Sequence, residues 1–261
     1  MKYIDTHSHL YSDKFSADRP KVIARAQEVL EAVFLPNIDL DSVESMLALN
    51  HQYPQFFFPM MGLHPSHVKE GFESVLEKMK LLLDDPSQTY YGIGETGIDL
   101  YWDKTTLPLQ QASLEIQIAW AKAYGLPIIL HAREAIDETY KVIAKHHDES
   151  LSGIFHCFDG TVEQAAKIRE LGTFKLGIGG IVTYRKKFPE VVRQIGLDLL
   201  VLETDSPYLA PKPFRGKRNE SSYTLYIAEK IGEIFDIPQT EVADISNHNA
   251  REIFVTAPLP V

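Results

Sequence analysis

Short apolar runs alternate with amphipathic helical patterns along almost the whole chain, and this alternation limits the possible folds more than any other feature. Eight runs rich in β-branched and aromatic residues predict strands at Tyr3–Thr6, Ala32–Pro36, Phe56–Leu63, Tyr90–Glu95, Pro127–His131, Gly153–His156, Phe174–Ile178 and Leu199–Glu203. Because these runs are apolar throughout, both faces of each strand should be buried, which is typical of a parallel sheet.

Helical patterns with recognisable ends separate most of these runs. Asp18 and Pro20 precede an apolar stripe that reaches Leu30, and the stripe in Phe72–Leu83 stops before Pro86. Five more helices are predicted, three of them from caps, glycines and prolines: Pro108–Tyr124, Thr161–Leu171, Pro189–Ile195 and a C-terminal pair at about Ser222–Phe235 and Gln239–Phe254.

Eight strand–helix units in 261 residues fit either a closed barrel or a doubly wound sheet. The glycine-rich stretch Gly177–Gly180 does not have the G-x-G-x-x-G spacing of a dinucleotide-binding turn. We therefore predict a TIM (β/α)8 barrel, with residues 1–261 forming a single domain.

Composition limits the setting and the partners. The net charge of −10 argues against a protein that coats nucleic acid through a global basic field, so an anionic substrate needs a local patch and metal ions. The lone Cys157 excludes an intrachain disulfide, and we interpret it as a buried residue that faces away from His156. With no signal-like or membrane-spanning apolar run, we expect a cytoplasmic protein with no membrane partner and no obligatory protein partner.

Residues able to bind metal follow the predicted strands. His7 and His9 end the first strand and, at i and i+2, point to the same face. Further potential ligands end four other apolar runs, namely Glu95, His131, His156 and Asp205. The carboxyl ends of the strands meet at one rim of a barrel. The six side chains are therefore predicted to hold two divalent ions that share Glu95, with Zn, Mn, Co or Ni favoured over Mg.

Seven motifs in this order resemble the TatD family of metal-dependent deoxyribonucleases, within the amidohydrolase superfamily: Asp5–His9, Gly62–Pro65, Gly94–Asp99, His131–Arg133, His156–Phe158, Glu203–Leu209 and Arg215–Glu220. The resemblance covers essentially the whole chain. It implies a TIM barrel, hydrolysis of DNA as a 3′→5′ exonuclease or broader nuclease, and the same six metal ligands. Two departures leave these ligands unchanged: family members often have an acidic residue close behind the H-x-H pair, whereas here Leu10-Tyr11-Ser12 precedes Asp13, and Ser221 replaces a proline.

The mechanism we hypothesise from these residues is attack of a metal-activated water on phosphorus. Glu95 would bridge the ions, and Asp205 would orient the water and accept its proton. Glu203 and Asp5 lie one step deeper and are expected to support the ligands.

Substrate contacts are expected around the same rim. His64 follows the third strand and is predicted to bind a phosphate, with a structural role as its rival, and Arg133 is predicted to bind phosphate, with a plain salt bridge as its rival. The basic loop Lys212–Asn219 contributes Arg215, Lys217 and Arg218 as candidate phosphate contacts, although such a loop can also be merely solvated. Aromatic residues near these loops can stack bases or line the cleft, namely Tyr101, Trp102, Tyr208 and Phe214.

Two other functions compete with hydrolysis of DNA or another phosphodiester. The first is metal-dependent hydrolysis of a small cyclic amide or ester, as in amidases and lactonases of the same superfamily, many of which have a carboxylated lysine where this chain has Glu95. The second is a non-catalytic barrel that binds nucleic acid or protein. Six convergent ligands argue against the second, because a binding module has no need of them.

Overall fold

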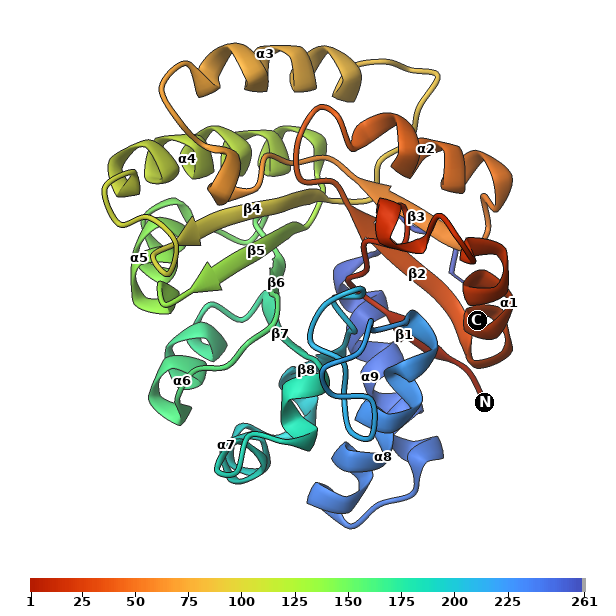
Figure 1. The fold of residues 1–261 in the computed structure, drawn as a ribbon. Coiled ribbons are helices and arrows are strands. Elements are labelled where there is room, and N and C mark those ends of the chain that lie inside the picture. The colour runs from red at the N-terminus through yellow and green to blue at the C-terminus, as the bar shows by residue number, and fades with distance from the viewer. Residues whose placement is uncertain (260–261) are drawn as a thin grey trace.

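Parallel strands form the centre of the molecule, seen in a computed structural model that describes residues 1–259 (Figure 1). The strands are β1 (Tyr3–Asp5), β2 (Leu30–Pro36), β3 (Phe57–Met60), β4 (Ile93–Asp99), β5 (Ile128–Arg133), β6 (Gly153–Phe155), β7 (Phe174–Ile178) and β8 (Leu200–Leu202). Each pairs in parallel with the next along the chain, within a group β1–β3 and a group β4–β8.

Backbone hydrogen bonds close the two seams between these groups. Between β3 and β4, Met61 N donates to Gly92 O at 3.1 Å and Gly94 N donates to Met61 O at 2.8 Å. Between β8 and β1, Thr6 N donates to Leu202 O at 3.0 Å and Asp205 N donates to the His7 carbonyl at 2.9 Å. The predicted TIM (β/α)8 barrel is confirmed.

Helices cover the outside of the barrel (Figure 1). They are α1 (Arg19–Val29), α2 (Val43–Gln52), α3 (Phe72–Leu83), α4 (Leu107–Tyr124), α5 (Ile136–His146), α6 (Val162–Glu170), α7 (Phe188–Ile195), α8 (Thr224–Phe235) and α9 (Gln239–Ile253). Helices α2 and α5 are not among those predicted from the sequence. No capping side chain marks the start of α5, which follows Ala135. Within residues 1–259, no helix combines the length and the apolarity that a membrane crossing requires.

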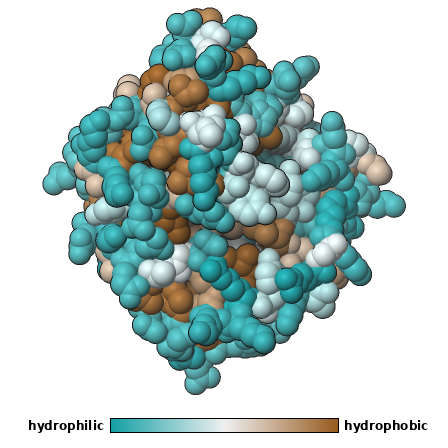
Figure 2. All heavy atoms as spheres, turned by 60° about the vertical axis from the view of Figure 1, so that its left-hand side comes forward, coloured by the Kyte–Doolittle hydropathy of each residue, from teal (hydrophilic) through white to brown (hydrophobic). Residues whose placement is uncertain are grey.

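The last helix, α9, covers the end of the barrel where the strands begin. Asn247 Nδ2 donates to the Lys2 carbonyl at 2.9 Å, and Asn249 Nδ2 donates to the Leu200 carbonyl at 2.7 Å. Phe254 stacks on Phe34 with ring centroids 3.6 Å apart. Polar side chains cover most of the outer surface in the view of Figure 2, with hydrophobic groups in smaller areas between them. Because α9 packs over the end where the strands begin, a functional site is expected at the opposite end, which is formed by the carboxyl ends of the strands.

The boundaries of β4 differ from the prediction. The strand begins at Ile93 and continues to Asp99, so Glu95 lies inside it and Asp99 ends it. Gly97 makes this continuation possible, because it pairs with His131 at φ +138° and any Cβ there would lie 2.0 Å from the His131 carbonyl oxygen. Strands β6 and β8 are shorter than predicted, so His156, Glu203 and Asp205 follow them in the connecting loops.

Replacing Gly97 with alanine should therefore destabilise the barrel. The clash with the His131 carbonyl is expected to lower the free energy of unfolding by about 1–3 kcal/mol. Gly179→Ala is a matched control, because its Cβ would meet nothing closer than 3.6 Å, and it should change stability by no more than about 0.5 kcal/mol. Urea unfolding measures both, and equal stabilities would contradict this account of β4.

Candidate metal centre

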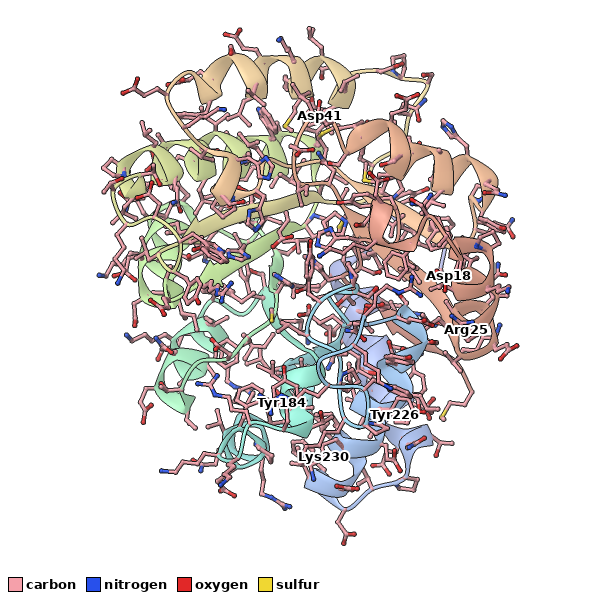
Figure 3. All side chains as sticks on the ribbon, in the orientation of Figure 1. Asp18, Arg25, Asp41, Tyr184, Tyr226 and Lys230 are labelled. Atoms are coloured by element: carbon pink, nitrogen blue, oxygen red, sulfur yellow. The ribbon has the colours of Figure 1, made fainter. Side chains whose placement is uncertain are left out.

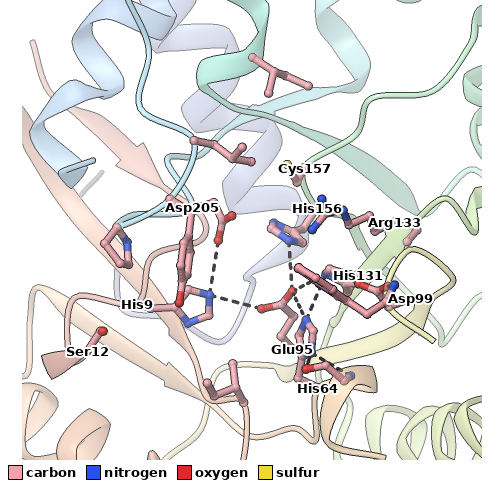
Figure 4. Close-up of a pocket in the computed structure, with 18 of the residues that line it drawn as sticks. His9, Ser12, His64, Glu95, Asp99, His131, Arg133, His156, Cys157 and Asp205 are labelled. Carbon is pink, nitrogen blue, oxygen red and sulfur yellow. Dashed lines mark hydrogen bonds and ion pairs between the residues drawn. The ribbon is translucent and has the colours of Figure 1, made fainter. Parts of the chain in front are cut away.

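The six predicted metal ligands meet at the carboxyl ends of the strands, around Glu95. Figure 4 shows His9, His131, His156 and Asp205 around this carboxylate. One oxygen of Glu95, Oε2, lies 3.2 Å from His7 Nε2 and 3.3 Å from His9 Nε2. Asp205 Oδ1 completes this side, at 3.4 Å from His9 Nε2 and 3.7 Å from His7 Nε2. His7 and His9 therefore point into the site together, as their i, i+2 spacing predicts.

The other oxygen of Glu95 faces a second group of histidines. Oε1 lies 2.9 Å from His131 Nδ1, 3.2 Å from His156 Nε2 and 3.3 Å from His64 Nε2. Hence each of the two oxygens of this buried carboxylate lies close to a different set of imidazoles. The metal-binding groups in this region overlap: His7–His9–Glu95, His7–His156–Asp205 and His64–Glu95–His131.

These residues fit a divalent metal. Imidazole nitrogens and carboxylate oxygens are ligands of Zn, Mn, Co and Ni, and in each of the three groups the ligand atoms lie within 4.8 Å of one another. The His7 and His156 rings stack with centroids 3.6 Å apart, an arrangement that disfavours protonation of both. His7 Nδ1 is buried without a hydrogen-bond partner among the described residues. A bound metal ion would balance the negative charge of Glu95 and Asp205 in place of protons on the histidines.

His64 lies close enough to Glu95 and His131 to be a metal ligand as well as a substrate contact. Its Nε2 is 3.2 Å from His131 Nδ1 as well as 3.3 Å from Glu95, and burial lowers its pKa to about 4. The sequence analysis assigns it to phosphate binding. Its position just after β3 is the same signal that identifies the other strand-end ligands.

Asp99 has no role in the sequence analysis, yet it holds one of the ligands. Its Oδ2 lies 2.8 Å from His131 Nε2, and its Oδ1 accepts hydrogen bonds from the backbone nitrogens of Tyr101 and Trp102. The carboxylate therefore fixes the His131 ring from behind and shapes the loop after β4. The alternation of β4 places Glu95, Gly97 and Asp99 on one face, which is the signal that could have identified it.

Glu203 supports a second ligand. Its Oε1 lies 3.2 Å from His156 Nδ1 and accepts a hydrogen bond from the Cys157 backbone nitrogen. Gly177 leaves room for this carboxylate, because a Cβ there would lie 2.0 Å from Glu203 Oε2. A carboxylate behind a metal-binding histidine orients the ring, and this contact agrees with the expected position of Glu203 one step below the rim.

Asp5 supports the backbone and not a ligand ring. Its carboxylate accepts hydrogen bonds from Thr204 N at 2.9 Å, Thr204 Oγ1 at 2.7 Å and His7 N at 3.3 Å. Burial raises the pKa of Asp5 to about 7. The side chain thus joins the ends of β1 and β8, which carry His7 and Asp205.

Tyr11 determines which nitrogen of His9 is free. Its hydroxyl donates to the Pro36 carbonyl at 2.6 Å and lies 2.8 Å from His9 Nδ1. A phenol has one proton, and the carbonyl can only accept, so His9 Nδ1 must be the donor to Tyr11. His9 therefore presents Nε2 toward Glu95 and Asp205 as the atom able to bind metal.

The electrostatics of the site favour a cation. Burial raises the pKa of Glu95, but the charges of His64 and the neighbouring histidines hold it well below its usual range. Burial lowers the pKa of His156, but Glu203 and Glu95 raise it well above the usual value. Protons on the histidines thus balance the buried carboxylates, and binding of a metal must release them.

A cavity of about 1120 Å³ opens above the metal-binding groups. Arg133, Arg215 and Lys217 line it, as expected for substrate contacts, whereas Arg218 does not. Both terminal nitrogens of Arg218 bind Asp18, at 2.7 and 2.8 Å. We therefore do not retain Arg218 as a phosphate contact.

Two other residues differ from their expected positions. Cys157 lines the cavity and does not face the core, because β6 ends at Phe155 and Cys157 has φ +48°, which breaks the alternation of a strand. Phe214 stacks on Tyr223, with ring centroids 4.2 Å apart, so its face is already covered.

Comparison with known proteins agrees with this geometry. A family model described as TatD related DNase matches residues 4–255. This chain belongs to the TatD family. It is 37% identical to a metal-dependent hydrolase, YabD, of Bacillus subtilis, over 96% of this chain and 98% of that one. The TatD homologue YJJV of Escherichia coli has a crystal structure that matches with a TM-score of 0.89 at 29% identity, covering 97% of this chain and 98% of that one.

One TatD relative has a name that specifies a reaction. It is called a 3′-5′ ssDNA/RNA exonuclease, comes from Edwardsiella piscicida, and is 29% identical over 96% of this chain and 98% of its own length. A yeast amidohydrolase of 18% identity shares the fold, with a TM-score of 0.82. Like its TatD relatives, this protein is a metal-dependent hydrolase.

The hydrogen bond from His9 to Tyr11 predicts an effect on metal affinity. In Tyr11→Phe, His9 Nδ1 loses its acceptor and the ring is no longer held, so affinity for Zn²⁺ or Mn²⁺ should fall about 10–100-fold. Calorimetric titration of the metal-free protein measures this. Tyr140→Phe on α5 removes a hydroxyl outside the site and should leave the affinity unchanged. Unaltered affinity in Tyr11→Phe would contradict the assignment.

Proposed function

We propose that this TatD-family protein hydrolyses phosphodiester bonds of nucleic acid, with DNA as the main substrate and 3′→5′ exonuclease activity as the mode of cleavage. One observation carries the proposal: the two oxygens of Glu95 face two separate groups of histidines below a cavity with cationic side chains. Two ions that share Glu95 are suited to a phosphodiester, whose attacking and leaving oxygens both need stabilisation.

Two sets of residues at Glu95 would hold the ions. His7, His9 and Asp205 lie on the Oε2 side, and His131 and His156 lie on the Oε1 side, with His64 as an additional candidate. Divalent ions bound there would lower the pKa of a water and offset the negative charge that develops on the phosphoryl group.

Asp205 has the properties of the group that orients the nucleophilic water and accepts its proton. Its side chain is 15% exposed and lines the cavity, so a water above the metal-binding groups can reach it. Burial raises the pKa of Asp205, but the hydrogen bond with His9 and nearby histidines hold it below the usual value. The carboxylate is therefore ionised at neutral pH and able to accept a proton.

Arg215 and Lys217 are the residues we assign to the phosphate backbone. Both line the cavity from the segment after β8, which also contributes Asp205 to the lining. Their location supplies the local basic patch that a protein with net charge −10 needs for an anionic substrate. The activity named for the Edwardsiella piscicida relative supports the same substrate class.

Hydrolysis of a small cyclic amide or ester is the weaker alternative. A neutral cyclic substrate has no use for several cations around the cavity. Activity on dihydropyrimidines or lactones, with none on oligonucleotides, would reverse this choice.

Loss of either carboxylate should abolish hydrolysis without unfolding the barrel. Glu95→Ala and Asp205→Asn are expected to reduce cleavage of a fluorescent single-stranded oligonucleotide more than about a hundredfold. Circular dichroism should show unchanged secondary structure. Removal of metal with a chelator should have the same effect, and Mn²⁺ or Zn²⁺ should restore activity. Undiminished cleavage by the metal-free protein would refute the proposal.

The basic loop yields a matched pair of variants. Arg215→Ala should weaken oligonucleotide binding and reduce the slope of log affinity against log salt by about 1, because one phosphate contact is lost. Arg218→Ala removes the same charge from the same loop, but this guanidinium already binds Asp18 outside the cavity. Its substrate affinity and salt slope should stay unchanged. Equal effects of the two substitutions would show that only net charge matters.

A further inference from the structure

Two aromatic rings stand exposed at the edge of the cavity, in the loop between β4 and α4. The Trp102 side chain is 71% exposed and lines the cavity, and Tyr101 beside it is 48% exposed. Their ring centroids are 4.9 Å apart and the rings are nearly perpendicular, at 87°. Exposed aromatic surface of this size contributes little to folding, so a ligand is the natural explanation for it.

The loop that carries the rings is tied to the metal centre. Asp99 Oδ1 accepts hydrogen bonds from the backbone nitrogens of Tyr101 at 2.9 Å and Trp102 at 3.0 Å, while Asp99 Oδ2 holds His131. One carboxylate therefore positions both the aromatic pair and a histidine of the site. The rings are exposed but their backbone is fixed, which is what a stacking surface requires.

Arg133 completes this group. Its guanidinium lies 3.6 Å from the centroid of the Tyr101 ring and 5.5 Å from that of Trp102. Arg133 follows His131 by two residues on β5 and also lines the cavity. Within residues 1–259 it makes no ion pair, so its charge is available to an anionic ligand. The salt bridge considered in the sequence analysis is replaced by a cation–π contact.

Charge is distributed unequally around the cavity. Arg133 and Arg215 lie on the β4–β8 side, where Arg215 covers the Tyr184 ring at 4.5 Å. Asp39 and Asp41 line the cavity from the loop after β2, whereas Asp159, which lines it on the β4–β8 side, is paired with Arg185 at 2.8 Å. Figure 3 shows Asp41 near α2 and Tyr184 near α7, at opposite sides of the barrel mouth. A polyanion is therefore attracted to the side that carries the aromatic residues and repelled from the other.

We propose that Trp102, Tyr101 and Arg133 form a nucleobase subsite. An unpaired base of the substrate strand stacks on Trp102, and Arg133 faces a phosphate of the same strand. Stacking on aromatic side chains needs an uncovered base face, which a strand end or a single strand offers and the interior of a duplex does not. The subsite rests on the proposed function for the identity of its ligand as nucleic acid, but its binding can be measured without turnover.

Tryptophan fluorescence tests the subsite directly. The chain has two tryptophans, Trp102 and the buried Trp120, which is 8% exposed, so quenching by a stacked base reports on Trp102. The Asp205→Asn protein is titrated with a short single-stranded oligonucleotide and with an abasic oligonucleotide of the same length. We expect quenching by the first alone, and an affinity about 5–100-fold higher for the strand that has bases.

Substitutions identify the residue responsible. Trp102→Ala should remove the quenching and the preference for bases, whereas Trp102→Phe should retain most of the preference. Leu81→Ala is the matched control, because Leu81 on α3 is 73% exposed but does not line the cavity. Equal binding of the abasic strand, or an affinity in Trp102→Ala equal to that of the control, would overturn the subsite.

Turnover separates this proposal from the proposed function. In the otherwise unmodified enzyme, Trp102→Ala should raise the KM for an oligonucleotide but not the KM for the abasic oligonucleotide of the same length, because the abasic strand has no ring to stack on Trp102. If the unmodified enzyme cleaves neither substrate but nucleotides still quench Trp102, the proposed function fails and the subsite stands. If it cleaves both and Trp102→Ala has no effect on either KM, the subsite fails and the proposed function stands.

Discussion

The buried carboxylate of Glu95 is the interaction on which the rest of the site depends. An ionised carboxylate away from water costs several kcal/mol unless opposite charge and hydrogen bonds compensate for it. Here the compensation comes from five imidazoles that approach its two oxygens within 2.9–3.3 Å. Such a cluster is stable only with protons or metal cations among the rings. Glu95 and the imidazoles around it therefore both require a nearby cation and supply the atoms that would bind it.

A surrounding set of polar residues keeps these rings in place. Asp99 holds His131, Glu203 holds His156, and Tyr11 holds His9, each through the nitrogen that faces away from Glu95 or Asp205. These supports come from different strands and loops, so the barrel itself determines how they meet. Supporting contacts of this kind set the orientation and basicity of metal-binding histidines. The site is therefore prepared for metal before any ion arrives.

The cavity above the metal centre reconciles an acidic protein with the anionic substrate that we propose for it. A net charge of −10 repels polyanions in general, but the side of the cavity formed by β4–β8 carries Arg133, Arg215 and Lys217. The opposite side carries Asp39 and Asp41. Local charge at short range outweighs the net charge, which is largely screened beyond about 8–10 Å at physiological salt.

Much of this arrangement could be predicted from the order of residues alone. Apolar runs that each end on a histidine or an acid are sufficient to predict a parallel barrel and a shared rim, because strand ends must meet there. His7 and His9 lie where the two-residue period of a strand puts them. The register of β4 could not be predicted, since Gly97 continues the strand only because the His131 carbonyl packs against its bare Cα.

What the sequence by itself determined is the set of chemical groups and the end of the barrel at which they gather. Only the tertiary structure decided their partners. It put His64 beside Glu95, Asp99 behind His131 and Cys157 at the cavity, and it bound Arg218 to Asp18. The physical reason is range: strand periodicity acts over a few residues, whereas hydrogen bonds and ion pairs join residues that only the closed barrel brings within about 3 Å.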